Sequence, residues 1–246
     1  MNLEWEKFKH LFHPSWHVYM KSAIESEWMF KIFEKLKKEK EIICPSYENV
    51  FNSFLIDLNG VHTILILQEP YAWVKHGKIV ANGIPMDCSN TGKMQPSLEQ
   101  FYTGMEEELK EEIRGDISLS YLSEQGVMLL NSALTCKANK VGSHSSLWIP
   151  FMKYIFEEIF YTRNGTIYWM LGAEAKRIEK FIYPLGNYIF HSSHPASASH
   201  KGTTWSSEGI FTKINKILKE NSSNYVIWNP EEYKKTKFND DNSIPF

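Results

Sequence analysis

The sequence has few cysteines, and they stand far apart. It contains three, Cys44, Cys88 and Cys136, with no Cys-x-x-Cys pair among its 246 residues. This spacing argues against a disulfide framework, a zinc site or a four-cysteine iron–sulfur cluster. Because unpaired thiols suit a reducing compartment, we expect a cytoplasmic, intracellular protein that holds no metal.

Long apolar runs are also missing, and so is an excess of charge of either sign. No stretch reaches the roughly 18 apolar residues of a membrane span. The charged segment 1–9 does not resemble a signal peptide, so we expect no contact with a membrane. The net charge is −2. Any contact with a polyanion would therefore depend on local basic patches or on polar donors to phosphate.

Several catalytic signatures are absent as well. The sequence contains no P-loop, no Gly-x-Gly-x-x-Gly, no His-Glu-x-x-His and no Gly-x-Ser-x-Gly pattern. These absences weaken an assignment to nucleoside-triphosphate enzymes, dinucleotide-binding enzymes, zinc proteases or hydrolases with a nucleophile elbow. Any reaction site must therefore be sought in single residues that the fold brings together.

The sequence does contain alternating strand and helix patterns, without repeats or low-complexity linkers. With 43% hydrophobic residues the chain can bury one sizeable core. We expect a single domain over 1–246, with a helical part at 1–42 and a motif-bearing core at 43–228. Strands are predicted at 63–67, 127–130, 167–171 and 188–190, and helices at 25–41, 98–113 (capped by Ser97), 150–160, 173–181 and 210–218. This alternation predicts an α/β fold, a three-layer α/β/α sandwich with a central, mostly parallel four-stranded sheet.

Polar side chains follow three of these strands. Gln68, Glu69 and Tyr71 come after the first strand, Asn131 ends the second, and His194 follows the last. Because ligands of open α/β sheets bind at the carboxyl ends of the strands, we expect these groups to converge. A carboxylate orients water or stabilises a cation, an amide recognises a donor and acceptor edge, and an imidazole stabilises a developing anion.

Each of these residues also has a structural explanation when it is taken alone. Glu69 could cap a helix or pair with a cation, Asn131 could satisfy a turn, and His194 could be an ordinary loop residue. Their joint placement at strand ends is what favours a reaction site. Serine and histidine side chains near the same loops are plausible donors to phosphate, namely Ser97, Ser143, His144, Ser193, Ser197 and Ser199.

These residues lie in segments that resemble one family, the uracil-DNA glycosylases. The run from Gln68 to Tyr71 is similar to the family's water-activating motif, Gln-Asp-Pro-Tyr-His. The run 125–131 is similar to the strand that ends in the base-recognising Asn, and 194–199 resembles the His-Pro-Ser-Pro-Leu-Ser loop that enters the minor groove. Further likenesses, in chain order, are Pro45 with 50–54, Gln95–Leu98 and Ser143–Trp148.

The resemblance implies a DNA glycosylase that flips a base out of DNA and hydrolyses its N-glycosidic bond with water, without a cofactor. It implies that Glu69 stabilises the sugar cation and positions water, that His194 binds the base oxygen that gains charge, and that Asn131 recognises the base. Gln68, Tyr71 and Met86 complete the implied base pocket. The implied DNA contacts are Pro45, Ser97, Ser143, His144, Ser193, Ser197, Ala198, Ser199 and Lys201. We expect a monomer that binds single- or double-stranded DNA.

The sequence departs from the family pattern at the site itself. Glu69 stands where the family has Asp, Ala72 where it has His, and Ala198 where it has the wedge Leu. Met86 stands near the position where the family has the aromatic residue that stacks on the flipped base. The segment 71–83 is a few residues longer than the corresponding segment of the family. Trp73 is an alternative stacking residue, and Lys201 or Trp205 is an alternative wedge.

Two interpretations of these departures stay open. The pocket could be retuned for a modified pyrimidine, in DNA repair or in defence against modified phage DNA, or the protein could bind DNA or another protein without catalysis. An ordinary uracil-DNA glycosylase or a nucleoside or nucleotide hydrolase would also fit the same residues. The retained Tyr71 counts against a bulkier base, because in the family this ring excludes groups at the pyrimidine C5.

Overall fold

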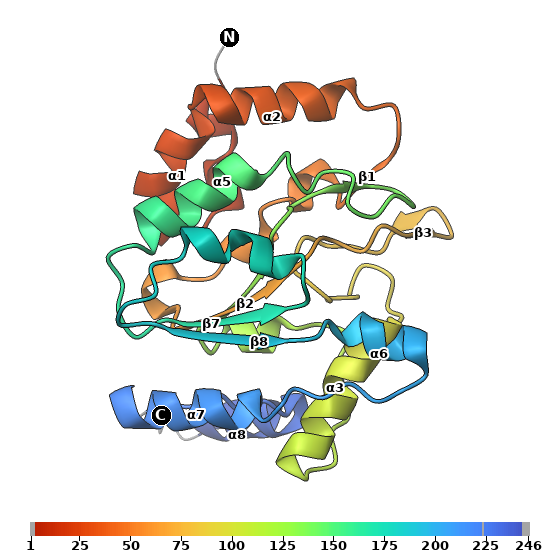
Figure 1. The fold of residues 1–246 in the computed structure, drawn as a ribbon, viewed down its shortest axis with the longest axis vertical. Helices are drawn as coiled ribbons and strands as arrows, with labels where there is room; N and C mark the ends of the chain where they lie inside the picture. The colour runs from red at the N-terminus through yellow and green to blue at the C-terminus, as the bar shows by residue number, and fades with distance from the viewer. Residues whose placement is uncertain (1–2, 223, 243–246) are drawn as a thin grey trace.

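The computed structural model describes residues 3–222 and 224–242, and its centre is a four-stranded sheet. The strands lie in the order β5-β2-β7-β8, and all three pairings are parallel. Their bounds are β2 (Thr63–Leu67), β5 (Val127–Asn131), β7 (Ile167–Leu171) and β8 (Tyr188–Ser192). Helices cover both faces of the sheet (Figure 1). The predicted α/β/α sandwich with a parallel four-stranded sheet is confirmed.

The three inner strands are buried along their whole length. Every residue of β2, β5 and β7 is buried, whereas four of the five residues of the edge strand β8 are half-buried. Continuous apolar runs are typical of parallel strands that are covered on both faces. Alternate residues of β2 point to opposite sides: Ile64 and Ile66 join one core cluster, and Leu65 and Leu67 join the other.

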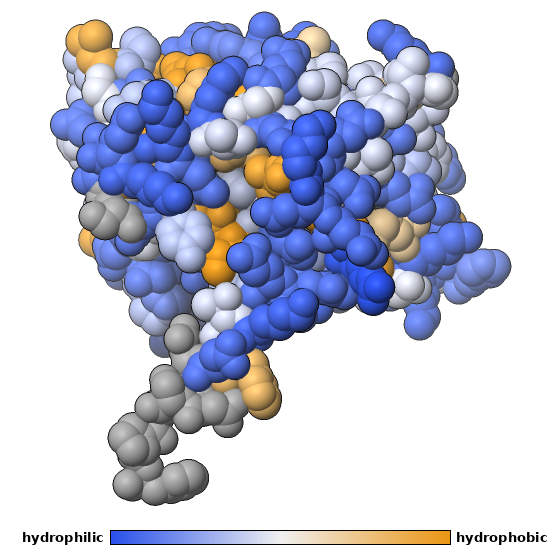
Figure 2. All heavy atoms as spheres, turned by 90° about the horizontal axis from the view of Figure 1, so that it is seen from below, coloured by the Kyte–Doolittle hydropathy of each residue, from blue (hydrophilic) through white to orange (hydrophobic). Residues whose placement is uncertain are grey.

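Each core cluster is closed by its own layer of helices. Above the sheet in Figure 1 lie α1 (His17–Ile24), α2 (Glu27–Lys38) and α5 (Ile149–Tyr154), which continues as a π-helical turn, Ile155–Ile159. Below it lie α3 (Pro96–Leu109), α7 (Ile210–Ser222) and α8 (Pro230–Asn242). Seen from below, the molecular surface is mostly hydrophilic with small separate apolar patches (Figure 2). The apolar faces of these helices are therefore used in the core.

Short elements connect the layers. Two small antiparallel pairs are formed by β1 (Ile43–Cys44) with β6 (Cys136–Lys137) and by β3 (Val74–Lys75) with β4 (Lys78–Ile79). The remaining helices are α4 (Ser120–Ser123), α6 (Pro195–Lys201) and the 3₁₀ turns Trp5–Lys7, Lys9–Leu11, Pro14–Trp16, Tyr47–Asn49, Asn52–Phe54, Leu58–Gly60 and Ala175–Phe181.

Several predicted boundaries need correction. The helix predicted at 98–113 begins at Pro96 and ends at Leu109, and its N-cap is Gln95. The predicted Ser97 cap is wrong, because Ser97 lies in the first turn and its hydroxyl is bonded to the Tyr71 hydroxyl. The strand predicted at 188–190 extends to Ser192.

The elements that were not predicted individually include the helices α1, α4, α6 and α8 and the short strands β1, β3, β4 and β6. Residues 195–201 and 230–242 carry few apolar side chains, so neither shows the periodic stripe that indicates an amphipathic helix. The helix predicted at 210–218 extends to Ser222 and is followed by α8. All three cysteines are free and buried. Within the described residues, no helix has the length and apolar character that crossing a membrane requires.

Candidate active site

The candidate site lies at the carboxyl edge of the sheet. The register sets Leu67 beside Asn131 and Leu171 beside Ser192, so Glu69 and His194 follow their strands by two residues each. The backbone N–H of Ser132 donates to the Leu67 carbonyl at 2.8 Å, which ties the ends of β2 and β5 together. Parallel strands present their ends on one side, so the edge gathers the acid, the amide and the imidazole that the sequence singled out.

Glu69 is held by a single backbone donor. Both of its carboxylate oxygens accept the N–H of Gly142, at 2.8 and 2.9 Å. Gly142 has a φ of +77°, a conformation that favours glycine. Burial raises the pKa of Glu69, the Gly142 N–H acts in the opposite direction, and the Glu174 carboxylate nearby raises it again. The acid is therefore oriented, and it holds its proton more readily than an exposed glutamate.

Asn131 ends β5 and presents an unsatisfied oxygen. The residue is 1% exposed, and its Oδ1 has no hydrogen-bond partner within residues 3–222 and 224–242. Leaving a buried acceptor unpaired costs about 1–3 kcal/mol. A ligand that brings an N–H donor to this oxygen would recover that free energy, which is what recognition of a base edge requires.

Hydrogen bonds of its hydroxyl group hold the Tyr71 ring in place. Its hydroxyl lies 2.6 Å from Ser97 Oγ and donates to the Met86 carbonyl at 3.4 Å. Burial raises the pKa of Tyr71 well above its usual value, so the phenol stays neutral. The Met86 side chain is buried in the core cluster below the sheet. Ser97, predicted to contact phosphate, is itself buried and bonded to Tyr71.

His194 is the N-cap of α6. Its Nδ1 accepts the N–H of Ala196 at 3.1 Å. A ring nitrogen that accepts a hydrogen bond carries no proton, so the proton of the neutral imidazole lies on Nε2. The helix cap thus selects the tautomer in which Nε2–H can donate to an anionic oxygen.

The remaining predicted DNA contacts divide by burial. Four of them are exposed or half-buried in the loop after β8 and in α6, namely Ser193, Ser197, Ser199 and Lys201. Ser143 is half-buried, and its hydroxyl accepts the N–H of Lys137. In this conformation three side chains are not part of the molecular surface, namely Pro45, His144 and Ala198.

Trp205, the alternative wedge, is 1% exposed and stacks on Phe101 at 5.7 Å between ring centroids. That assignment is wrong, because the indole belongs to the core.

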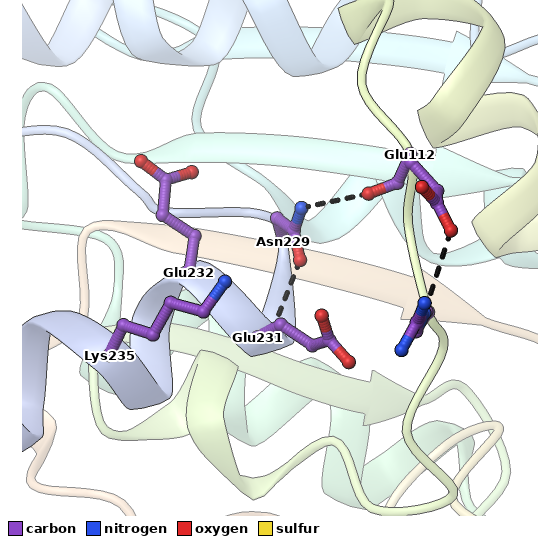
Figure 3. Close-up of a pocket in the computed structure, with 6 residues that line it drawn as sticks. Glu112, Asn229, Glu231, Glu232 and Lys235 are labelled. Carbon is purple, nitrogen blue, oxygen red and sulfur yellow. Dashed lines mark hydrogen bonds and ion pairs between the residues drawn. The ribbon is translucent and has the colours of Figure 1, made fainter.

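A cavity of about 830 Å³ lies near the contact between Glu69 and Gly142, but Glu69, Asn131 and His194 are not among the residues that line it. Gln68 and Gly142 line it from the site, and Glu174, Arg177 and Lys180 line it from the turn after β7. A second, polar hollow lies near the other end of α3, where Asn229 bonds the Glu112 carbonyl and the Glu231 N–H (Figure 3). It contains none of the predicted residues. The described residues hold no cluster of His, Cys, Asp or Glu suited to a metal ion.

Gly142 is a residue of the candidate site that the sequence did not indicate. A glycine before Ser143 suggests a turn with positive φ, which is the one local signal available. Its contact with Glu69 joins residues 73 positions apart, and no spacing pattern predicts such a pair.

No model of a known protein family matches the chain. The uracil-DNA glycosylase of Pseudomonas aeruginosa is 29% identical over 220 residues, which cover 87% of this chain and 93% of that protein. The uracil-DNA glycosylase of Streptococcus pneumoniae is 26% identical, over 88% of this chain and 98% of that protein. Over most of its length the chain is thus similar to uracil-DNA glycosylases. The resemblance inferred from the motifs is thereby confirmed.

Solved structures show the same fold. Mimivirus uracil-DNA glycosylase superposes with a TM-score of 0.79 at 22% identity, over 90% of this chain and 88% of that one. The enzyme from Nitratifractor salsuginis superposes with a TM-score of 0.54 at 18% identity, over 79% and 90% of the two chains. At such identities the likeness concerns the fold, and the roles of single residues stay predictions.

Proposed function

We propose that this protein is a monofunctional DNA glycosylase, which flips a pyrimidine out of DNA and hydrolyses its N-glycosidic bond to leave an abasic site. The observation that carries the proposal is the gathering of Glu69, Asn131 and His194 at one sheet edge, with Asn131 Oδ1 buried and unpaired among the described residues. The named activity of its relatives supports it. We keep the predictions that it acts as a monomer, on DNA inside the cell and without a cofactor.

The proposed reaction separates charge, and each residue meets one part of it. The bond from C1′ to the base nitrogen breaks with its electron pair on the base, which leaves a cationic sugar. Glu69, held by Gly142, stabilises that cation and takes a proton from the water that attacks C1′. The Nε2–H of His194 donates to the base oxygen that becomes negative. Asn131 Oδ1 accepts an N–H from the base edge.

We propose further that the target is a modified pyrimidine rather than plain uracil. A methionine near the usual stacking position, a longer segment 71–83 and the cavity beside Glu69 support this. The fixed ring of Tyr71 favours an ordinary uracil-DNA glycosylase instead. The longer acid at position 69 favours a catalytically silent protein that binds DNA or a protein partner. The biological role would be repair or defence against phage DNA.

A substrate panel tests these proposals. The purified chain is incubated with single- and double-stranded oligonucleotides that carry uracil, hydroxymethylated or glucosylated pyrimidines, and abasic sites are scored. We expect abasic sites on at least one modified pyrimidine, formed faster than on uracil. Glu69→Gln and Asn131→Ala should each lower the rate at least about 10²-fold, whereas Glu220→Gln, on exposed α7, should not.

Each contrary result has a meaning. Preference for uracil would identify an ordinary uracil-DNA glycosylase, and DNA binding without abasic sites would identify the silent protein. Free nucleosides cleaved faster than DNA would identify a nucleoside hydrolase. Full turnover by Glu69→Gln would refute the role assigned to that carboxylate.

A further inference from the structure

The hairpin of β3 and β4 is a rigid element at the border of the site. Val74 pairs with Ile79 and Lys75 with Lys78, and the Val80 N–H donates to the Trp73 carbonyl at 3.0 Å. The two turn residues, His76 and Gly77, both have positive φ, as a type I′ turn requires. Val74 and Ile79 pack on a small apolar cluster, so the hairpin has one anchored face and one exposed face.

The exposed face of the hairpin is basic. Lys75, His76 and Lys78 are exposed, and no acidic residue occurs between Tyr71 and Met86. No carboxylate lies within salt-bridge distance of Lys75 or Lys78 in the described part of the chain. The two lysines are directly opposite each other, a pairing that destabilises a hairpin. This arrangement costs stability, and an anionic ligand would offset that cost.

An exposed indole stands at the base of the hairpin. Trp73 is 44% exposed, the most exposed of the eight tryptophans, all of which the structure describes. Five of the others are almost fully buried: Trp16, Trp148, Trp169, Trp205 and Trp228. A flat aromatic ring beside cationic side chains is the combination that binds single-stranded nucleic acid, where bases stack on the ring and phosphates meet the cations.

Hydrogen bonds connect the hairpin to both sides of the site. Lys75 Nζ donates to Gln95 Oε1 at 2.7 Å, and Gln95 caps α3 two residues before Ser97, the partner of Tyr71. On the other side, Asn139 lies in the loop that leads to Gly142, and its N–H donates to the carbonyl of Ala72, just before the hairpin. Figure 1 shows the hairpin at the same end of the molecule as α6 and the start of α3.

We propose that this hairpin is a second DNA-binding element, which holds unpaired nucleotides next to the target base. Trp73 stacks on a neighbouring base, and Lys75 and Lys78 contact the phosphates on either side of it. The inference rests on the proposed function as a DNA glycosylase and adds a preference: a single-stranded or locally opened strand binds better than an intact duplex.

The test measures DNA binding and base excision in the same variants of the full chain. Affinity for a fluorescent single-stranded oligonucleotide and for its duplex is measured by anisotropy across a salt series. The double variant Lys75→Gln/Lys78→Gln should lower the salt slope by about 1.4, since each phosphate contact on a single strand contributes about 0.7. Trp73→Leu should weaken single-strand binding about tenfold, and Trp73→Phe should restore most of it.

The matched control removes two charges from a helix outside the site. Lys216→Gln/Lys219→Gln on α7 changes the net charge equally, and both side chains are exposed. We expect its salt slope to equal that of the unaltered protein. In excision assays the hairpin variants should raise KM and leave kcat nearly unchanged, because the reacting groups are intact. Thermal unfolding verifies that each variant is folded.

Two results would overturn the inference. One is that the unaltered protein forms abasic sites and the hairpin variants bind DNA and excise the base as well as the α7 control does. The proposed function would then stand and the hairpin would have no part in it. The other is that the unaltered chain shows no salt-dependent binding to DNA. That result would refute both the hairpin inference and the proposed glycosylase function. A protein that binds DNA through the hairpin but forms no abasic site would retain the inference and lose the glycosylase.

Discussion

At the scale of residues, one departure from the family pattern is a single methylene group in the acid of the candidate site. The family's aspartate is Glu69 here, and its longer side chain ends on the backbone N–H of Gly142. A carboxylate displaced by about 1 Å loses on the order of 10²-fold in rate unless the pocket is shaped for it. We propose that the contact with Gly142 adapts the candidate site to glutamate.

Glu69→Asp should therefore impair this protein, although it restores the family's residue. The shorter side chain no longer meets Gly142 in the same geometry, and we expect kcat to fall on the order of 10²-fold. Rates of abasic-site formation on the substrate that the panel identifies provide the measurement. Glu220→Asp on α7 is the control, and equal or higher kcat in Glu69→Asp would show that Gly142 does not orient the acid.

The pH dependence of excision follows from the same carboxylate. In the proposed reaction Glu69 acts as an ionised carboxylate, and burial together with Glu174 raises its pKa. Activity should thus be present above that raised pKa and decline as the pH falls through it, at a higher pH than an exposed glutamate would give. A pH profile of kcat/KM measures this. Glu174→Gln removes one cause of the shift and should move the acidic limb to lower pH; an unmoved limb would contradict the coupling.

At the scale of elements, α3 packs closely against the segment after α6. A Cβ on Gly104 of α3 would lie 2.5 Å from Trp205 Cε3 and 2.7 Å from the Trp205 carbonyl oxygen. Trp205 is in turn bonded to the Ser193 carbonyl through Nε1, at 2.8 Å. The glycine is what lets α3 approach the loop that carries His194.

Gly104→Ala should destabilise the protein even though alanine favours helices. Helix propensity alone would stabilise by up to about 1 kcal/mol, but overpacking against Trp205 costs about 1–3 kcal/mol. Urea unfolding of the variant measures the change in the free energy of unfolding and shows whether it is positive or negative. Glu107→Ala, an exposed position of the same helix, should stay within about 0.5 kcal/mol. A stabilised Gly104→Ala variant would mean that the Trp205 segment moves away easily.

At the scale of the whole molecule, the sheet was predictable because its pattern is local. The buried runs of β2 and β7 were located to the residue, since continuous apolar segments bounded by polar residues are typical of parallel inner strands. Elements without such a pattern were missed, and the hairpin, α6 and α8 are among them. The site followed from topology, because Glu69, Asn131 and His194 each come at or after the end of a strand. The single-domain division at residue 42 stays a prediction.

No periodic pattern indicated how residues 224–242 close the lower layer. Trp228 is buried against Phe211, with 4.9 Å between their ring centroids, and its carbonyl accepts the Tyr121 hydroxyl. The backbone of Ile227 exchanges two hydrogen bonds with the Gln125 side chain, at 2.8 and 3.0 Å. The segment is thus attached to the chain just before β5.

We therefore expect a structural role for residue 228. Trp228→Ala should cost about 3–5 kcal/mol of unfolding free energy, as large aromatic truncations in cores do. Chemical denaturation measures this change. Leu185→Ala, at a position that is 67% exposed, is the control and should change it by less than about 0.5 kcal/mol. Similar small effects in both variants would show that the C-terminal segment adds little to the fold.

The amino-acid sequence by itself determined the four strands of the central sheet, the three-layer architecture and the three polar residues at the strand ends, because these depend on neighbours in the chain. Only the tertiary structure decided that Gly142 holds Glu69, that Trp205 lies in the core and that Trp73 lies on the surface. Such contacts join residues tens of positions apart. Their geometry is set by how helices pack on the sheet, and apolar periodicity carries no information about it.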